Sequence, residues 1–204
     1  LEVIRQLESS GQMFLDISEL CKVSVDQFYG IEIEEFPAQI AQVAMWLMDH
    51  QMNIEVGRHF GRYFARIPLK ASATIVCANA LRIDWESVVP KEKLSYIMGN
   101  PPFSGARHMG AEQKADLLRV FESVKNAGDL DFVAAWFKKS SDYMAGSKIK
   151  SALVSTNSIA QGQSVSILWK HLLVECKIHI DFAYRTFKWN NESRNQAAVH
   201  CVII

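Results

Sequence analysis

Apolar and polar positions along the chain predict short strands that alternate with longer helices. Runs of β-branched and aromatic residues, bounded by polar residues or glycine, are typical of buried strands. Stretches with apolar residues at intervals of three or four are typical of amphipathic helices. The predicted strands are 28–33, 74–77, 94–98, 151–156, 177–185 and 197–204, and the predicted helices are 1–7, 37–52, 111–126, 131–146 and 167–175.

The order of these elements predicts an α/β fold. Strands that alternate with helices indicate a mostly parallel, doubly wound sheet. The last two predicted strands flank a polar loop, 186–196, which favours a terminal antiparallel hairpin. Ligands of doubly wound sheets bind at the carboxyl ends of the strands. The residues that follow each strand are therefore the candidates for chemistry.

Composition and charge narrow the class of protein. A chain of 204 residues, 49% of them hydrophobic, is long enough for one sizeable core, so we expect one globular domain. Its 22 basic residues balance 22 acidic residues, so a contact with nucleic acid must be local. We expect no membrane segment, because no apolar run approaches roughly 20 residues.

The cysteines indicate a reducing compartment. Cys21, Cys77, Cys176 and Cys201 form no CxxC pair, and no histidine stands at metal-ligand spacing. We therefore expect no metal site, reduced thiols and a cytoplasmic location.

The most specific signal is the sequence Asn100-Pro101-Pro102-Phe103, directly after a predicted strand. Two consecutive prolines remove two backbone donors and fix φ at both positions. The side-chain oxygen of Asn100 and the carbonyl of Pro101 are therefore two preorganised acceptors, which can draw a planar exocyclic amine towards tetrahedral geometry. Phe103 offers an aromatic face to a flipped base, a contact worth roughly 1–3 kcal/mol. The alternative is a plain turn with a buried phenylalanine.

Two other strand ends carry weaker signals. Glu32 could accept hydrogen bonds from the vicinal hydroxyls of a ribose, or it could be a solvated loop charge beside Glu34. Asn79 could read the edge of an adenine while Leu81 covers its face, or Asn79 could be a turn residue with Asp84 as a helix cap.

With these motifs the chain resembles the amino-methyltransferases that use S-adenosylmethionine, in particular bacterial DNA adenine-N6 methyltransferases of restriction-modification systems. The resemblance covers essentially the whole chain and implies a Rossmann-like class I methyltransferase sheet. NPPFSG is similar to the catalytic motif, while FYGIEIEEFPAQIAQVAMWLMDHQM and NALRIDW are similar to cofactor motifs. Segments 131–144, 151–163 and 185–204 are similar to later elements of the same domain.

The resemblance implies a role for each matched residue. Glu32 would bind the ribose of the cofactor, Ile33 and Leu81 would flank its adenine, and Asn79 would meet the adenine amine. Asn100 and Pro101, followed by Pro102, would polarise the target amine, and Phe103 would stack on the target base. In the last loop, Phe187 would pack against the flipped base with Trp189 as a neighbouring candidate, although either could merely cap the sheet. Arg185, Lys188 and Arg194 could meet phosphates or be solvated loop charges.

The chain departs from the family pattern at its start. The glycine-rich loop that cradles the methionine part of the cofactor is missing, and Gly11 does not supply it, because it stands alone after a helix. We therefore expect residues 1–204 to be a partial catalytic domain without its first, central strand and without a target-recognition domain. We also expect weak or no cofactor binding and no unaided catalysis. The implied partners are DNA and the missing methylase and recognition regions of a longer parent chain, with an endonuclease region where one is fused.

The resemblance implies adenine-N6 methylation of DNA and leaves three alternatives. Cytosine-N4 methylation modifies the same type of amine, although serine usually replaces the asparagine there. Protein-glutamine methyltransferases share the motif with tyrosine where this chain has Phe103. A non-catalytic scaffold of the methylase fold is favoured by the missing glycine-rich loop.

Overall fold

The strands that the structure describes form two sheets, one in each of two units. The computed structural model describes residues 22–60, 72–189 and 199–204. The chain divides into an N-terminal unit, residues 1–80, and a C-terminal unit, residues 81–204. The prediction that residues 1–204 form one partial catalytic domain stays a prediction.

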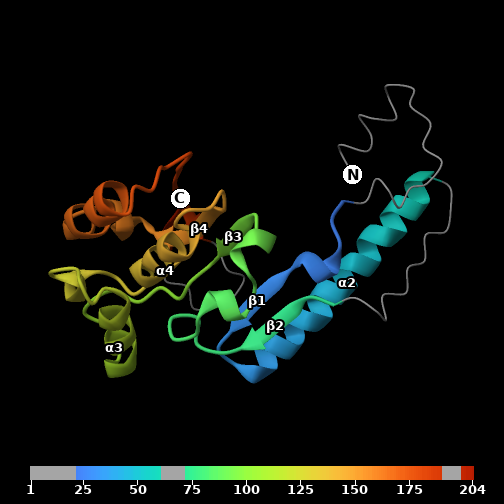
Figure 1. Ribbon diagram of the computed structural model, residues 1–204, viewed down its shortest axis with the longest axis horizontal. Helices are drawn as coiled ribbons and strands as arrows, with labels where there is room; N and C mark the ends of the chain where they lie inside the picture. Colours follow the sequence, from blue (N-terminus) through green and yellow to red (C-terminus); the bar gives the residue numbers. More distant parts are fainter. Residues whose placement is uncertain (1–21, 61–71, 190–198) are drawn as a thin grey trace. The chain divides into compact units, whose positions relative to one another are not determined.

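The N-terminal unit contains a parallel pair of strands and one long helix. Strand β1 (Tyr29–Glu32) pairs with β2 (Thr74–Cys77), which places Glu32 opposite Cys77. Helix α2 (Glu35–Phe60) follows β1 and packs against both strands (Figure 1). Parallel neighbours need a crossover connection, and α2 lies in it.

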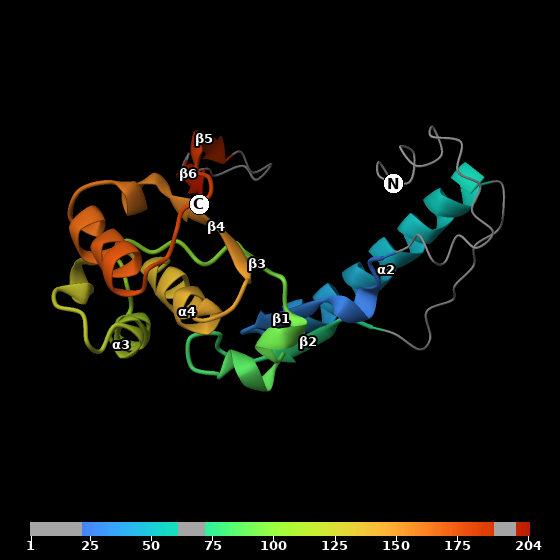
Figure 2. The same ribbon diagram turned by 45° about the horizontal axis from the view of Figure 1, so that its top comes forward.

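In the described part of the C-terminal unit, four strands lie in the order β3-β4-β6-β5 (Figure 2). Strand β3 (Tyr96–Gly99) pairs in parallel with β4 (Lys150–Thr156). Strand β6 (Val199–Ile203) is antiparallel both to β4 and to β5 (Tyr184–Trp189). The expected parallel strands with a terminal antiparallel hairpin are therefore confirmed.

Helices cover the core of the C-terminal unit. They are α3 (Ala111–Val120), α4 (Ala134–Met144) and two π-helical turns, η7 (Val165–Trp169) and η8 (His171–Glu175). Short 3₁₀ turns connect other elements: η3 (Trp85–Ser87), η4 (Lys91–Lys93), η5 (Ala127–Asp129) and η6 (Asn157–Ala160). The apolar core gathers side chains from these helices and from β4, among them Leu117, Val133, Leu153, Leu168 and Leu172.

Three predicted elements differ from the observed ones by more than a few residues. The helix predicted over 111–126 ends at Val120, and the helix predicted over 37–52 extends over residues 35–60. The strand predicted over 177–185 begins only at Tyr184, because residues 177–183 have no strand neighbour among the residues described. Strand β5 then runs on to Trp189, since its last residues pair with Val199–Cys201. The predicted helix 1–7 and the loop residues 190–196 lie outside the described residues.

Within the part of the chain that the structure describes, no helix is both long and apolar enough to cross a membrane.

Candidate functional site

Glu32 ends strand β1, and its carboxylate folds back onto the two residues that lie between β1 and α2. Its Oε1 accepts hydrogen bonds from the backbone N–H of Ile33 at 2.8 Å and of Glu34 at 3.3 Å. The backbone carbonyl of Glu32 accepts from the N–H of Ala78, at 2.8 Å, which ties the ends of β1 and β2 together. Among the described residues Oε2 has no hydrogen-bond partner, so this oxygen can accept from a hydroxyl group. The side chain of Ile33 is 61% exposed.

The residues after β2 differ in their exposure. Asn79 lies in an irregular segment after the strand and is half-buried. Leu81 is only 3% exposed and belongs to the core of the C-terminal unit, so it offers little surface to a ligand. Asp84 caps η3, because its Oδ1 accepts from the N–H of Glu86 at 3.1 Å.

The loop Asn100-Pro101-Pro102-Phe103 leaves the carboxyl end of β3 directly. Asn100 and Pro102 are exposed, whereas Pro101 is buried. Phe103 is half-buried and packs against the core of the C-terminal unit. The loop is thus anchored by the buried Pro101 and the half-buried Phe103, and it leaves the side chain of Asn100 accessible.

The segment after Phe103 is tied to the start of α4 by residues that the sequence analysis missed. The carbonyl of Ser104 accepts from the N–H of Phe132 at 2.8 Å. The N–H of Ala106 donates to Oδ1 of Asp131 at 3.1 Å. An aspartate just before a helix is an ordinary signal for a cap, so its place in the sequence does not reveal this distant contact.

Phe187 and Trp189 lie on β5 instead of in the predicted loop. Alternate residues of a strand share a face. The ring centroids of Phe187 and Trp189 are 6.3 Å apart, and the two rings are tilted by 40°. Phe187 is half-buried, and Trp189 is 37% exposed. The two rings therefore form one aromatic surface on the hairpin.

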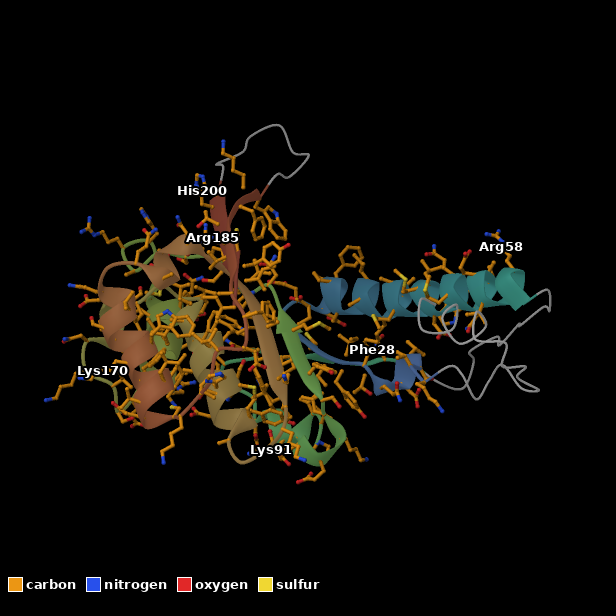
Figure 3. All side chains as sticks on the ribbon, turned by 90° about the horizontal axis from the view of Figure 1, so that it is seen from above. Phe28, Arg58, Lys91, Lys170, Arg185 and His200 are labelled. Carbon is orange, nitrogen blue, oxygen red and sulfur yellow. The ribbon has the colours of Figure 1, made fainter. Side chains whose placement is uncertain are left out.

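The basic candidates of the hairpin are exposed. Arg185 and Lys188 are on β5. Figure 3 places Arg185 and His200 on the hairpin, far from Lys91 of the same unit. Arg194 lies outside the described residues.

An ion pair fixes the segment that follows Leu81. Nε of Arg82 donates to Oδ1 of the buried Asp116 on α3 at 2.7 Å, and Arg119 lies 3.7 Å from the same oxygen. The hydrogen bond from Arg82 and the charge of Asp116 raise the pKa of the Arg82 guanidinium above its ordinary value. The cation therefore stays charged and holds this turn against α3.

Other charged groups do not indicate a metal centre. In residues 22–60, 72–189 and 199–204 no three histidine, cysteine, aspartate or glutamate side chains are placed to hold a metal ion. Burial raises the pKa of the Cys201 thiol, which favours its neutral form.

The predicted site residues fall into two groups. Glu32, Ile33 and Asn79 belong to the N-terminal unit, where the first two stand at the carboxyl end of β1. Leu81, the loop 100–103 and the aromatic pair of β5 belong to the C-terminal unit.

Comparisons with known proteins agree on one family. The model of the family "MmeI, DNA-methyltransferase domain" matches residues 1–204. A protein of Bacillus subtilis (strain 168), described as DNA methyltransferase A, is 42% identical over 207 residues, which cover 100% of this chain and 23% of the relative.

A solved structure shows the same fold. It is that of the type IIL restriction-modification enzyme MmeI in complex with DNA, which is 57% identical and superposes with a TM-score of 0.87 over 99% of this chain. The match covers 27% of that enzyme's chain, so this chain spans about a quarter of the length of the relatives it matches. The similarity confirms the expected Rossmann-like methyltransferase fold. Since the family model matches every residue, this chain belongs to the MmeI DNA-methyltransferase domain family.

Proposed function

We propose that the complete protein containing this chain transfers a methyl group from S-adenosylmethionine to N6 of adenine in DNA. It would do so in the bacterial cytoplasm, within a restriction-modification system. The observation that carries this proposal is the loop Asn100–Phe103, which leaves the end of β3 with two prolines, a buried anchor and an accessible amide side chain.

The chemistry of the loop suits a poorly nucleophilic amine. The lone pair of an exocyclic adenine amine is delocalised into the ring, and it becomes available when both N–H groups are held by acceptors. The side-chain oxygen of Asn100 and the backbone carbonyl of Pro101 are those acceptors, and neither must reorganise during the reaction. The nitrogen is cationic after it gains the methyl group, so its proton can leave to water without a strong base.

The flipped base would lie between aromatic side chains. Phe103 provides one face, and the paired rings of Phe187 and Trp189 on β5 are candidates for the other face or for the edge. The exposed Arg185 and Lys188, together with Arg194, are candidates for contacts with DNA phosphates.

The residues after β1 and β2 fit a nucleoside. Oε2 of Glu32 is the acceptor for the ribose hydroxyls, Ile33 offers an exposed apolar face, and Asn79 is a candidate for contact with the adenine ring. Leu81 is too deeply buried to be proposed as such a contact. S-adenosylmethionine, when bound, supplies a methyl group activated by a sulfonium centre.

The role of Asn100 can be tested with the complete protein. Asn100→Ala removes one acceptor and should lower kcat for methyl transfer by at least about 100-fold, as for other preorganised polar groups. Asn100→Asp keeps acceptor oxygens and should lose less. The assay measures transfer of labelled methyl groups to plasmid DNA, followed by nucleoside analysis.

A matched control is Gln163→Ala, which removes an exposed amide side chain from the same unit and should leave kcat unchanged. Undiminished methylation by Asn100→Ala would exclude the proposed role. N4-methylcytosine as the labelled nucleoside would exclude adenine as the target, and label in protein alone would exclude DNA.

A further inference from the structure

A hydrogen-bonded network holds the segment that follows the proposed catalytic loop, Asn100–Phe103. The network is centred on Asp131, which lies between η5 and α4. One carboxylate oxygen, Oδ1, accepts from the N–H of Ala106 at 3.1 Å. The other oxygen, Oδ2, accepts a short hydrogen bond from the hydroxyl of Ser158. Oγ of Ser158 lies 2.6 Å from Oγ1 of Thr156, the last residue of β4. One side chain thus links the segment after Phe103 to the carboxyl end of the neighbouring strand.

The backbone beside Asp131 adds a second link. The N–H of Phe132 donates to the carbonyl of Ser104 at 2.8 Å, two residues before the first link at Ala106. The N–H of His108 donates to the carbonyl of Gly105 at 2.8 Å and closes the turn. The path of the chain directly after Phe103 is therefore fixed at successive points.

The catalytic loop needs support of this kind. Pro101 and Pro102 have no N–H groups, so these two residues cannot donate hydrogen bonds that would hold the loop in place. Its first residue is held by β3, which ends at Gly99. The segment after Phe103 must then be held by other elements, because acceptors work only within about 0.5 Å of the productive geometry.

We propose that Asp131 is a positioning residue for methyl transfer, and that its carboxylate fixes the segment after Phe103 relative to the end of β4. This inference rests on the proposed function, since it assigns Asp131 to the same site. Asp131 acts through the loop and does not touch the reacting amine. Ser158 orients the carboxylate from the side of β4.

The kinetic test compares three variants of the complete protein. Asp131→Ala removes both hydrogen bonds of the side chain. It should lower kcat by roughly 10- to 100-fold, which is the effect expected from a small misplacement of reacting groups. KM for DNA should change by less than about threefold. Asp131→Asn should recover most of kcat, because its amide oxygen still accepts from Ala106 and its NH₂ group can donate to Ser158. Ser158→Ala should give an intermediate loss.

Tyr143→Phe is the control for a general loss of stability. It deletes a buried hydrogen bond in the same unit, to the carbonyl of Val89, without touching the loop. It should lower Tm and leave kcat unchanged. Equal losses of kcat in Asp131→Ala and Tyr143→Phe would overturn the positioning role, and so would failure of Asp131→Asn to recover activity.

A second measurement does not depend on activity. Hydrogen exchange followed by mass spectrometry should show faster exchange over residues 103–108 in Asp131→Ala and Ser158→Ala, with the exchange of β2 unchanged. Unchanged exchange in this segment would overturn the inference even if kcat fell. Wild-type protein that methylates no DNA would instead overturn the proposed function, and the exchange result would still decide whether Asp131 fixes the loop.

Discussion

Tyr143 shows how one side chain joins separate parts of the C-terminal unit. It is 7% exposed, and its hydroxyl donates to the carbonyl of Val89 at 2.5 Å. Its ring meets the ring of Trp85 edge-on, with centroids 5.7 Å apart, and Nζ of Lys91 lies 5.6 Å from its centroid. Helix α4 is thereby tied to the residues that lead into β3.

Tyr143→Phe should lower the free energy of unfolding of this chain by about 0.5–1.5 kcal/mol at neutral pH, the usual net value of a hydrogen bond. The ring and its packing remain, so the loss reports on the hydroxyl alone. Urea denaturation of both proteins measures the difference.

The stability that the Tyr143 hydroxyl contributes should depend on pH. Burial raises the pKa of Tyr143, and the carboxylates of Glu86, Glu92 and Asp84 add to the shift. The stability contributed by the neutral hydroxyl is therefore complete below the unfolded pKa, near 10, and is lost as the pH rises through the higher folded pKa. The difference between wild type and Tyr143→Phe should shrink above about pH 10. A difference that stays constant up to pH 11, which is about one unit above the ordinary pKa, would contradict this assignment.

Helix α2 has more apolar surface than its two strands can cover. Exposed apolar side chains recur at helical spacing along it, including Phe36, Ile40, Val43 and Leu47. Met48 and Met52 are exposed as well. A helix that is apolar on several sides is typical of one buried between other elements.

The double substitution Val43→Glu and Leu47→Glu should therefore reduce self-association of this 204-residue chain. Exposed apolar patches drive association, and two charges on the patch oppose it. Analytical ultracentrifugation over a dilution series and binding of an apolar dye measure the effect. Gln42→Glu with Gln51→Glu adds the same charge at exposed polar positions of the same helix and should change neither signal. Equal behaviour of the two double variants would show that charge alone, and not the apolar patch, sets association.

At the level of elements, the pattern of residues predicted strands well where a neighbour was available. Strand β2 runs over Thr74–Cys77, as predicted. A strand was predicted over 177–185 as well, but the N–H of Ile178 donates to the carbonyl of Leu172 in η8. Periodicity reports which side chains are apolar, whereas a strand also needs a partner, and partners are set by the tertiary structure.

Residues of the candidate site could be predicted where a local sequence pattern marks them, and not where only the tertiary structure brings them together. The sequence Asn100-Pro101-Pro102-Phe103 is rare at average composition, and it follows β3 directly, as its place in the sequence predicted. The link from Asp131 to Ala106 joins residues 25 apart in sequence, and no local pattern marks it. Phe187 and Trp189 were assigned to a loop although they lie on β5, because the strand partner of β5, Val199–Cys201, lies beyond a polar segment. Their role at the base stays a prediction.

At the scale of the whole molecule, the described strands form two sheets with open edges. Among the described strands, β1 has β2 as its one neighbour and β3 has β4. Such edges expose backbone N–H and C=O groups. The absence of a central strand between the strands that lead to Glu32 and to Asn100 remains a prediction, and so does the inactivity of the isolated chain.

Isothermal titration should show weak or no binding of S-adenosylmethionine to the 204-residue chain and saturable binding to the complete protein. The reason is that these 204 residues contain no glycine-rich loop after a strand for the methionine part of the cofactor. Glu32→Gln in the complete protein should weaken binding by roughly 10- to 100-fold, the scale of a hydrogen bond to a charged group. Equally tight binding by both proteins would show that the residues present here suffice.

The position of β6 between β4 and β5 has a consequence for synthesis of the protein. Val154–Thr156 of β4 pair with Cys201–Ile203, and β5 pairs with the same strand from its other side. A nascent chain therefore cannot complete the sheet of the C-terminal unit until residues 199–203 have emerged from the ribosome. Contacts between residues so distant in sequence form slowly. While translation proceeds, the edge of β4 stays open to chaperones and to other nascent chains.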